Sequence, residues 1–288
     1  CDMDAVMAVA RRHGLKVLED ACQGVGGGYE GRMLGAIGDA GAFSFNFFKN
    51  MTCGEGGAVV TSDDAVAERA RCAIDPCHFY WQGRADGLRP FAGAGARASE
   101  LMGAMLNVQL DRIGGFVAAM RANRRRLLEE AGGLGNHGPV PAPMHSPDHD
   151  CAAHLFFTLP EAETARVFAR AVGGIVAGRT GRHTFTNWDQ VLQREGAHHP
   201  GLNPYDMPQN AGCRGDIPEC FGARSLDILA RTVMLPMSPF HTGEDLDVMA
   251  HNVRTAATAL AQGRAGEIAG LRRAAEPDLQ KFDALAGE

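Results

Sequence analysis

The spacing of apolar side chains at the start of the chain predicts a helix followed by a strand. Apolar residues recur at helical intervals over 3–13, and Gly14 follows as a helix-ending residue. The apolar run 15–18 then leads into Glu19 and Asp20, which is typical of a short buried strand. This alternation predicts a doubly wound α/β sheet, with Asp20 at the carboxyl end of one strand.

Two further apolar runs continue the pattern. Residues 41–48 form the most apolar run of the chain and predict a buried strand, and 58–61 predict another strand after a glycine-rich turn. Ser62 can cap a helix that we expect over 63–74.

The next segment, 75–97, has the composition of a long loop, which in a compact domain usually serves function or an interface. Helices are expected over 99–113 and 116–131. The second of these helices carries four arginines on what we expect to be a solvated face: Arg121, Arg124, Arg125 and Arg126.

A stretch rich in glycine, proline and histidine at 132–150 predicts a linker between two domains. Residues 1–131 would then form a large α/β domain, and 151–288 a smaller α+β domain with a loosely held tail. The elements expected in the smaller domain are strands at 153–159, 174–177 and 233–235 and helices at 161–171, 223–230 and 244–261.

Composition narrows the class of protein. The 288 residues are 45% hydrophobic and 22% charged, which describes a soluble globular chain, and no apolar run approaches the roughly 18 to 20 residues of a membrane span. A net charge of -6 argues against a nucleic-acid surface and favours small-molecule partners. The eight cysteines form no CxxC pair, so we expect reduced thiols in a cytoplasmic protein and no metal site.

Lysine is scarce in this chain, and one lysine has an unusual place. Of the 28 basic residues only Lys16, Lys49 and Lys281 are lysines, and Lys49 ends the most apolar run. Burial lowers the pKa of an amine and leaves a nucleophile suited to Schiff-base chemistry. The alternative is a strand-end lysine whose ammonium reaches solvent along its stem.

Asp20 is expected at the carboxyl end of a neighbouring strand, where open α/β sheets bind ligands. An amine for an aldehyde and a carboxylate for a pyridine nitrogen are the groups that a pyridoxal phosphate site requires. Taken alone, Asp20 also fits a turn or helix cap. The glycines at 24–28 lack the G-x-G-x-x-G spacing of a dinucleotide loop, so a nicotinamide cofactor is not favoured.

Three blocks in this order resemble the DegT/StrS family of sugar aminotransferases: EDACQG at 19–24, GDAGAFSF at 38–45 and KNMTCGEGG at 49–57. The resemblance implies the aspartate-aminotransferase-like fold type I of PLP-dependent transferases. It implies that Lys49 holds the cofactor as an internal aldimine and that Asp20 bonds the pyridinium nitrogen. Gln23 would contact the ring near its phenolic oxygen, and Ser44 would bind the phosphate.

The function implied by this resemblance is transamination of a nucleotide-linked keto-sugar by a homodimer, with glutamate or glutamine as amino donor and Lys49 as general base. One alternative is an aminotransferase acting on a cyclitol ketone of the scyllo-inosose type in antibiotic biosynthesis. The others are a non-catalytic member that keeps the fold for regulation or assembly, and an α/β protein without cofactor.

Two features depart from the family pattern. A phosphate-binding loop and a ring-stacking aromatic normally precede the first block, so the resemblance implies a large domain incomplete at its front, with little or no turnover. Gly95 stands where an asparagine normally reaches the partner's phosphate. Farther on, the donors and aromatics at 181–188 are expected to shape a substrate pocket or to form a packed loop.

Overall fold

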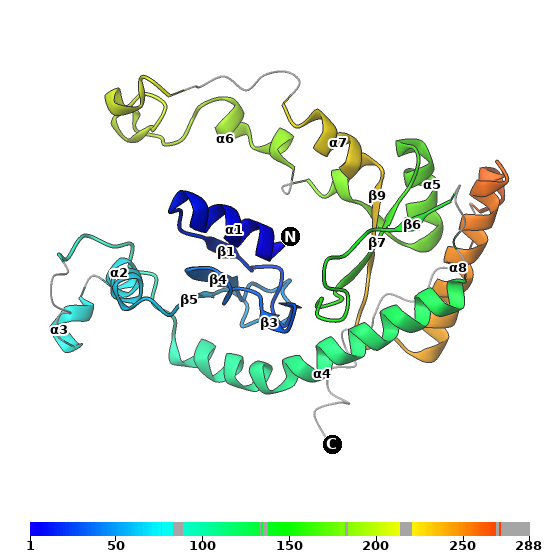
Figure 1. Ribbon diagram of the computed structural model, residues 1–288, viewed down its shortest axis with the longest axis horizontal. Coiled ribbons are helices and arrows are strands. Elements are labelled where there is room, and N and C mark those ends of the chain that lie inside the picture. The colour runs from blue at the N-terminus through cyan, green and yellow to red at the C-terminus, as the bar shows by residue number, and fades with distance from the viewer. Residues whose placement is uncertain are drawn as a thin grey trace. The chain divides into compact units, whose positions relative to one another are not determined.

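The computed structural model describes residues 1–75, 77–82, 89–132, 134, 138–181, 184–213, 221–268 and 271 (Figure 1). It divides into two compact units. The first comprises Cys1–Arg125, Pro143–Ala153 and Met237–Phe240, and the second comprises Arg126–Ala142, His154–Pro236 and His241–Glu288. Part of the segment expected as a linker, 143–150, therefore belongs to the first unit.

A three-stranded sheet forms the centre of the first unit. β1 (Leu18–Asp20) pairs in parallel with β4 (Ala40–Ser44), and β5 (Gly57–Thr61) pairs antiparallel with the other edge of β4. Helix α1 (Met3–His13) precedes β1 and has the predicted bounds. The strand begins later than predicted, but Asp20 is its last residue, as expected. The short strands β2 (Gly28–Tyr29) and β3 (Arg32–Met33) form a separate hairpin.

The apolar run 41–48 is not one continuous buried strand. β4 ends at Ser44, and Phe47 and Phe48 are 64% and 76% exposed. The chain turns here because the Asn46 side chain accepts the Phe48 N–H at 3.2 Å and the Asn46 carbonyl accepts the Lys49 N–H at 3.0 Å. Lys49 thus lies in a turn beyond the strand, and its backbone is fixed by local polar contacts.

Helix α2 (Asp64–Ile74) is capped by Asp63 and not by the predicted Ser62. Asp63 Oδ1 accepts the N–H groups of Ala65 at 2.9 Å and Val66 at 3.2 Å. Either residue type suits the position, and the carboxylate one residue later reaches the free N–H groups here. A short helix, α3 (His78–Gln82), follows within the segment expected to be a loop.

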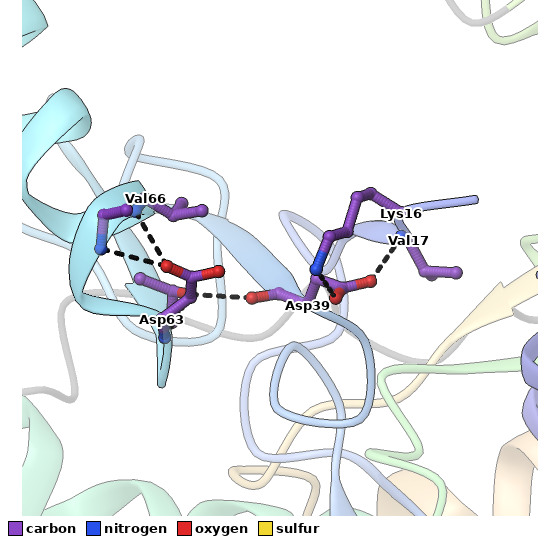
Figure 2. Close-up of polar contacts among 7 residues, drawn as sticks. Lys16, Val17, Asp39, Asp63 and Val66 are labelled. Atoms are coloured by element: carbon purple, nitrogen blue, oxygen red, sulfur yellow. Dashed lines mark hydrogen bonds and ion pairs between the residues drawn. The ribbon is translucent and has the colours of Figure 1, made fainter. Parts of the chain in front are cut away.

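Asp39 ties the start of the sheet together, as Figure 2 shows. Its carboxylate pairs with Lys16 at 2.8 Å and accepts the Val17 N–H at 2.8 Å, just before β1. Its carbonyl accepts the Thr61 hydroxyl at 2.7 Å at the end of the antiparallel β5. Because β1 and β4 are parallel, this network lies at the opposite end of the sheet from Asp20.

Helix α4 (Glu100–Ala131) is a single element of 32 residues where two helices were predicted. Gly114 and Gly115 each weaken a helix by about 1 kcal/mol relative to alanine. Neither has a positive φ, and no proline follows to stop the helix. Val117 and Met120 are buried against Ala152, so packing on the C-terminal side carries the helix across the glycine pair.

The arginines of α4 do not all lie on a solvated face. Arg124 is only 6% exposed, and its guanidinium pairs with the Asp150 carboxylate. Arg121 donates to the carbonyls of His149 and Asp150, both at 2.6 Å. These charge-assisted bonds hold the segment Pro143–Ala153 on the helix, which corrects the expectation of a purely solvated arginine face.

The second unit contains an antiparallel sheet in the order β6-β7-β9-β8. Its strands are β6 (Val140–Pro141), β7 (His154–Thr158), β8 (Ile175–Val176) and β9 (Thr232–Pro236), and its longer helices are α5 (Ala162–Val172), α7 (Ala223–Ala230) and α8 (Gly243–Ala261). Helix α5 packs on β9 and α8. Phe157 and Phe168 are fully buried between β7 and α5, with ring centroids 5.4 Å apart. The predicted strands and helices of this unit are thus present, within about two residues of the predicted bounds.

Shorter helical turns connect these elements: α6 (Asp189–Leu192), η1 (Ala177–Arg179), η2 (Phe185–Asn187), η3 (Pro200–Leu202), η4 (Pro208–Asn210) and η5 (Ala265–Ile268). Residues 182–183 of the expected substrate segment, Cys220 and most of the tail after 268 lie outside the described residues. Among the residues that are described, no helix is long and apolar enough to cross a membrane.

Candidate active site

Asp20 presents its carboxylate at the carboxyl end of β1. The residue is exposed, and its Oδ1 accepts the Cys22 N–H at 3.2 Å. The pKa of Asp20 lies below its usual value because the Cys22 side chain and backbone both hydrogen-bond the carboxylate, and the charge of Lys49 lowers it further. Asp20 is therefore an anion at neutral pH.

The preceding residue, Glu19, points to the opposite face of the strand and has a structural role. It is 8% exposed, and its carboxylate accepts three backbone N–H groups, from Gly35 at 2.8 Å and from Ile37 and Gly38 at 2.6 Å each. These bonds satisfy the buried charge and fix the loop that precedes β4. Of the two adjacent carboxylates, Asp20 is the one that a ligand can reach.

The loop held by Glu19 crosses β4 so closely that two glycines are required. A Cβ on Gly41 would lie 2.0 Å from the Gly35 carbonyl oxygen. Gly35 has a φ of +86°, and a Cβ there would lie 2.4 Å from the Phe43 ring. The glycines of this sequence block thus serve the close packing that places β4 beside β1.

Ser44 is the last residue of β4 and lies at the same end of the sheet as Asp20, because the two strands are parallel. Its Oγ accepts the Asn46 N–H at 3.3 Å. The Asn46 amide in turn donates to Glu55 Oε1 at 2.7 Å, across the base of the following turn. These contacts fix the hydroxyl and start the turn that carries Lys49.

Lys49 is half-buried, and its amine is an electrostatic neighbour of both Asp20 and Cys22. The pKa of the Cys22 thiol is raised, chiefly by its hydrogen bond to Asp20, while Lys49 acts in the opposite direction. The amine of Lys49 and the carboxylate of Asp20 are therefore within electrostatic reach of each other, at the end of two parallel strands.

An apolar cluster lies beneath the Lys49 turn. Its buried members are Val25, Phe45, Met51 and Cys53, and Phe43, Ala58, Met102, Leu106 and Ile113 pack against them. Residues before and after Lys49 are thus anchored in the core, at roughly 1.5 to 3 kcal/mol for each large apolar side chain fully buried. The cluster thus holds both sides of the turn, and Lys49 at its tip is not a member of the cluster.

Gln23 lies in the loop directly after Asp20 and is exposed. The loop is shaped by the Gly24 N–H, which donates to the Ala21 carbonyl at 2.9 Å. Gly95 has a φ of +69°, and nothing lies within 4 Å of the position of a Cβ on it. Asparagine is among the few residues besides glycine that adopt this conformation, so the backbone here suits the family's usual residue as well as the glycine present.

Sequence reasoning missed two organising residues of the site, Asn46 and Asn50. Both are polar residues on either side of Lys49 in an otherwise apolar stretch, which was an available signal. An asparagine in a turn is common, however, and its side-chain partners are not evident from spacing. The structure shows the Asn50 amide donating to the Val25 carbonyl at 3.2 Å.

No metal-binding group of three or more His, Cys, Asp or Glu side chains occurs within the described part of the chain. The seven cysteines there are free thiols.

Comparison with known families matches residues 1–172 to the DegT/DnrJ/EryC1/StrS aminotransferase family. GDP-perosamine synthase of Caulobacter vibrioides is 39% identical over 123 residues, which are 41% of this chain and 31% of that protein. The dTDP-3-amino-3,4,6-trideoxy-alpha-D-glucose transaminase of Streptomyces venezuelae is 36% identical over 156 residues, 54% of this chain and 39% of that protein.

Solved structures share the fold. DesV of S. venezuelae, crystallised in complex with a ketimine intermediate, has a TM-score of 0.60 at 26% identity, over 89% of this chain and 62% of that chain. A family member from Brucella abortus has a TM-score of 0.62 at 21% identity, over 88% of this chain and 61% of that chain. The predicted fold type I is confirmed, and the chain spans less than two thirds of the length of each relative named here.

Proposed function

Because the chain belongs to the DegT/DnrJ/EryC1/StrS aminotransferase family, we propose that it carries the lysine-bearing site of a pyridoxal-phosphate-dependent sugar aminotransferase. The single observation that supports this most is that Lys49 and Asp20 lie at the same end of the sheet, within electrostatic reach of each other. The cofactor needs an amine at its aldehyde and, at the opposite end of the ring, a carboxylate that stays ionised beside the pyridine nitrogen.

The side chains at the site fit the cofactor chemically. Asp20 is anionic and exposed, as a partner of a protonated pyridine nitrogen must be. The hydroxyl of Ser44 suits a phosphate oxygen, and the amide of Gln23 suits the phenolic oxygen of the ring. When bound, pyridoxal phosphate supplies an aldehyde that condenses with amines and a ring that accepts an electron pair.

The residues of the chain would then divide the work. Lys49 Nζ would hold the cofactor through its aldehyde group. When it is not bound to the cofactor, Nζ would accept the proton from the α-carbon of the donor and act as general base. Asp20 keeps the pyridine nitrogen protonated throughout, because its lowered pKa prevents it from taking that proton back.

For the substrate we propose a nucleotide-linked keto-sugar, with glutamate or glutamine as the amino donor. Support comes from the two curated relatives, whose names refer to GDP- and dTDP-linked amino sugars. A homodimer in the cytoplasm is the matching proposal for the assembled enzyme. Transfer of ¹⁵N from labelled glutamate or glutamine to a dTDP- or GDP-linked keto-hexose supports this substrate class, whereas transfer only to a cyclitol ketone overturns it.

Trapping the cofactor tests the site directly. The chain is incubated with pyridoxal phosphate, reduced with borohydride and digested, and the labelled peptide is identified by mass spectrometry. Label on Lys49 that is lost in Lys49→Ala is expected. Lys16→Ala is the matched control, since Lys16 is an exposed lysine that pairs with Asp39 at the other end of the sheet. Equal labelling of wild type and Lys49→Ala contradicts the proposal.

A further inference from the structure

Two segments meet at the candidate site, and a hydrogen bond joins them. The first is the loop after β1, 21–27, and the second is the Lys49 turn, 45–56. The side-chain amide of Asn50 donates to the carbonyl of Val25 at 3.2 Å. Val25 is only 9% exposed and belongs to the apolar cluster beneath the turn, and the bond that its carbonyl accepts is partly buried.

Three consecutive side chains point to three different partners at this place. The charge of Lys49 acts on Asp20, the amide of Asn50 bonds the loop after β1, and Met51 is buried in the apolar cluster. Met51 packs the turn in the core, and the bond from Asn46 to Glu55 closes its base. The Asn50 bond adds a polar contact between the residue next to Lys49 and the segment that follows Asp20.

We propose that Asn50 is a positioning residue, whose bond to Val25 fixes the Lys49 turn relative to Asp20 and so directs the lysine amine at the cofactor aldehyde. The inference rests on the proposed role of Lys49. It assigns to Asn50 no contact with the cofactor, and its effect passes through the backbone of the turn. Holding a reacting amine in place removes orientational freedom before the bond forms.

The chain offers a matched control for this bond. Asn123 of α4 also donates its side-chain amide to a backbone carbonyl of the same unit, that of Ser238, at 2.9 Å. Loss of either amide leaves one carbonyl unpaired, so Asn50→Ala and Asn123→Ala are expected to reduce thermal stability similarly. A purely structural Asn50 would do no more than that.

The experiment measures the dissociation constant of pyridoxal phosphate and the pH at which the visible band of the bound cofactor titrates. Asn50→Ala and Asn50→Asp are expected to weaken binding about tenfold, because the lysine amine is no longer held toward the cofactor, and to shift the titration. Asn50→Gln, which keeps the donor, is expected to recover most of the affinity. Asn123→Ala should leave both quantities at the wild-type values.

Two results overturn the inference in distinguishable ways. If wild type carries the borohydride-trapped label on Lys49 but Asn50→Ala and Asn50→Gln match Asn123→Ala in affinity and titration, Asn50 has only a structural role. If wild type carries no label on Lys49, the proposed function fails, and the inference fails with it. Because Asn50→Gln retains the amide, it provides a folded protein for these measurements even if Asn50→Ala does not fold.

Discussion

The charge of Lys49 acts on Asp20 and adds to the Cys22 hydrogen bonds that lower its pKa, although Lys49 lies in a turn after β4 and Asp20 at the end of β1. The parallel pairing of the two strands brings them to the same end of the sheet. The hydrogen bonds from Cys22, and after them the charge of Lys49, thereby favour the ionised form of the carboxylate.

Removing the charge of Asp20 is expected to impair the cofactor site without harming the fold. The residue is exposed, so Asp20→Asn should fold normally. Its pKa is lowered in the folded protein, so the charge is present from neutral pH down past the ordinary value of about 3.9. The visible band of bound pyridoxal phosphate should therefore show no transition due to Asp20 between about pH 8 and 5, whereas Asp20→Asn should bind at least about tenfold more weakly. Wild-type affinity in Asp20→Asn would exclude the proposed pairing with the pyridine nitrogen.

Arg124 is expected to be a major contributor to the stability of the first unit. Arg124→Ala leaves the Asp150 carboxylate without its cationic partner, which should lower the free energy of unfolding by about 2 to 3 kcal/mol, allowing for the partial exposure of Asp150. Urea denaturation measures the change. Arg125→Ala, on an exposed neighbouring residue, should change it by less than about 0.5 kcal/mol. Similar effects of the two variants would contradict the buried role of Arg124.

His241 is expected to make the protein less stable in mild acid. Burial lowers its pKa, and the Pro236 carbonyl and the charge of Asp245 oppose this only in part. The unfolded chain then binds the proton more tightly than the folded one, so the stability contribution present above the ordinary pKa of about 6.5 is lost as the pH falls below it. The midpoint temperature of thermal unfolding should therefore decrease as the pH is lowered from 7.5 to about 5.5.

His241→Gln should reduce that fall, while His198→Gln, on an exposed histidine of the same unit, should not. An unchanged pH dependence in His241→Gln would assign the effect to another group.

Two glycine-to-alanine substitutions are expected to have opposite signs. Gly41→Ala places a Cβ 2.0 Å from the Gly35 carbonyl oxygen and should destabilise by about 3 kcal/mol or more, since backbone must move. Gly114→Ala, where nothing lies within 4 Å in the middle of α4, should stabilise by about 0.5 to 1 kcal/mol. Unfolding curves of the two variants test this, and a stabilised Gly41→Ala would disprove the close crossing.

The bounds of α1 and the position of Asp20 could be predicted from the sequence, because residues close in the chain determine both. Helix α1 has the predicted bounds because Asp2 caps its start, accepting the Ala5 N–H at 3.0 Å, and Gly14 ends it with a left-handed φ of 61°. The place of Asp20 could likewise be predicted, since a polar residue directly after an apolar run marks the end of a strand.

Contacts between distant residues were beyond that reasoning. Arg124 is buried because Asp150 returns to it from 26 residues away, which no helical periodicity can indicate. The continuous hydrophobicity of the run that begins at Gly41 predicts one strand, yet the side-chain contacts of Asn46 turn the chain after Ser44. Long-range partners and side-chain bonds to backbone decided both cases.

Because Glu19 and Asp20 point to opposite faces of β1, the register of this strand decides which side chain faces the ligand. A slip of β1 that put Asp20 in the place of Glu19 would turn it toward the three N–H groups that now bind Glu19, and would put Ala21 in the place that Asp20 now occupies. The shorter aspartate would reach those donors poorly, so the misaligned sheet would be both less stable and wrongly equipped. Folding correctly and presenting the correct carboxylate are thus one requirement.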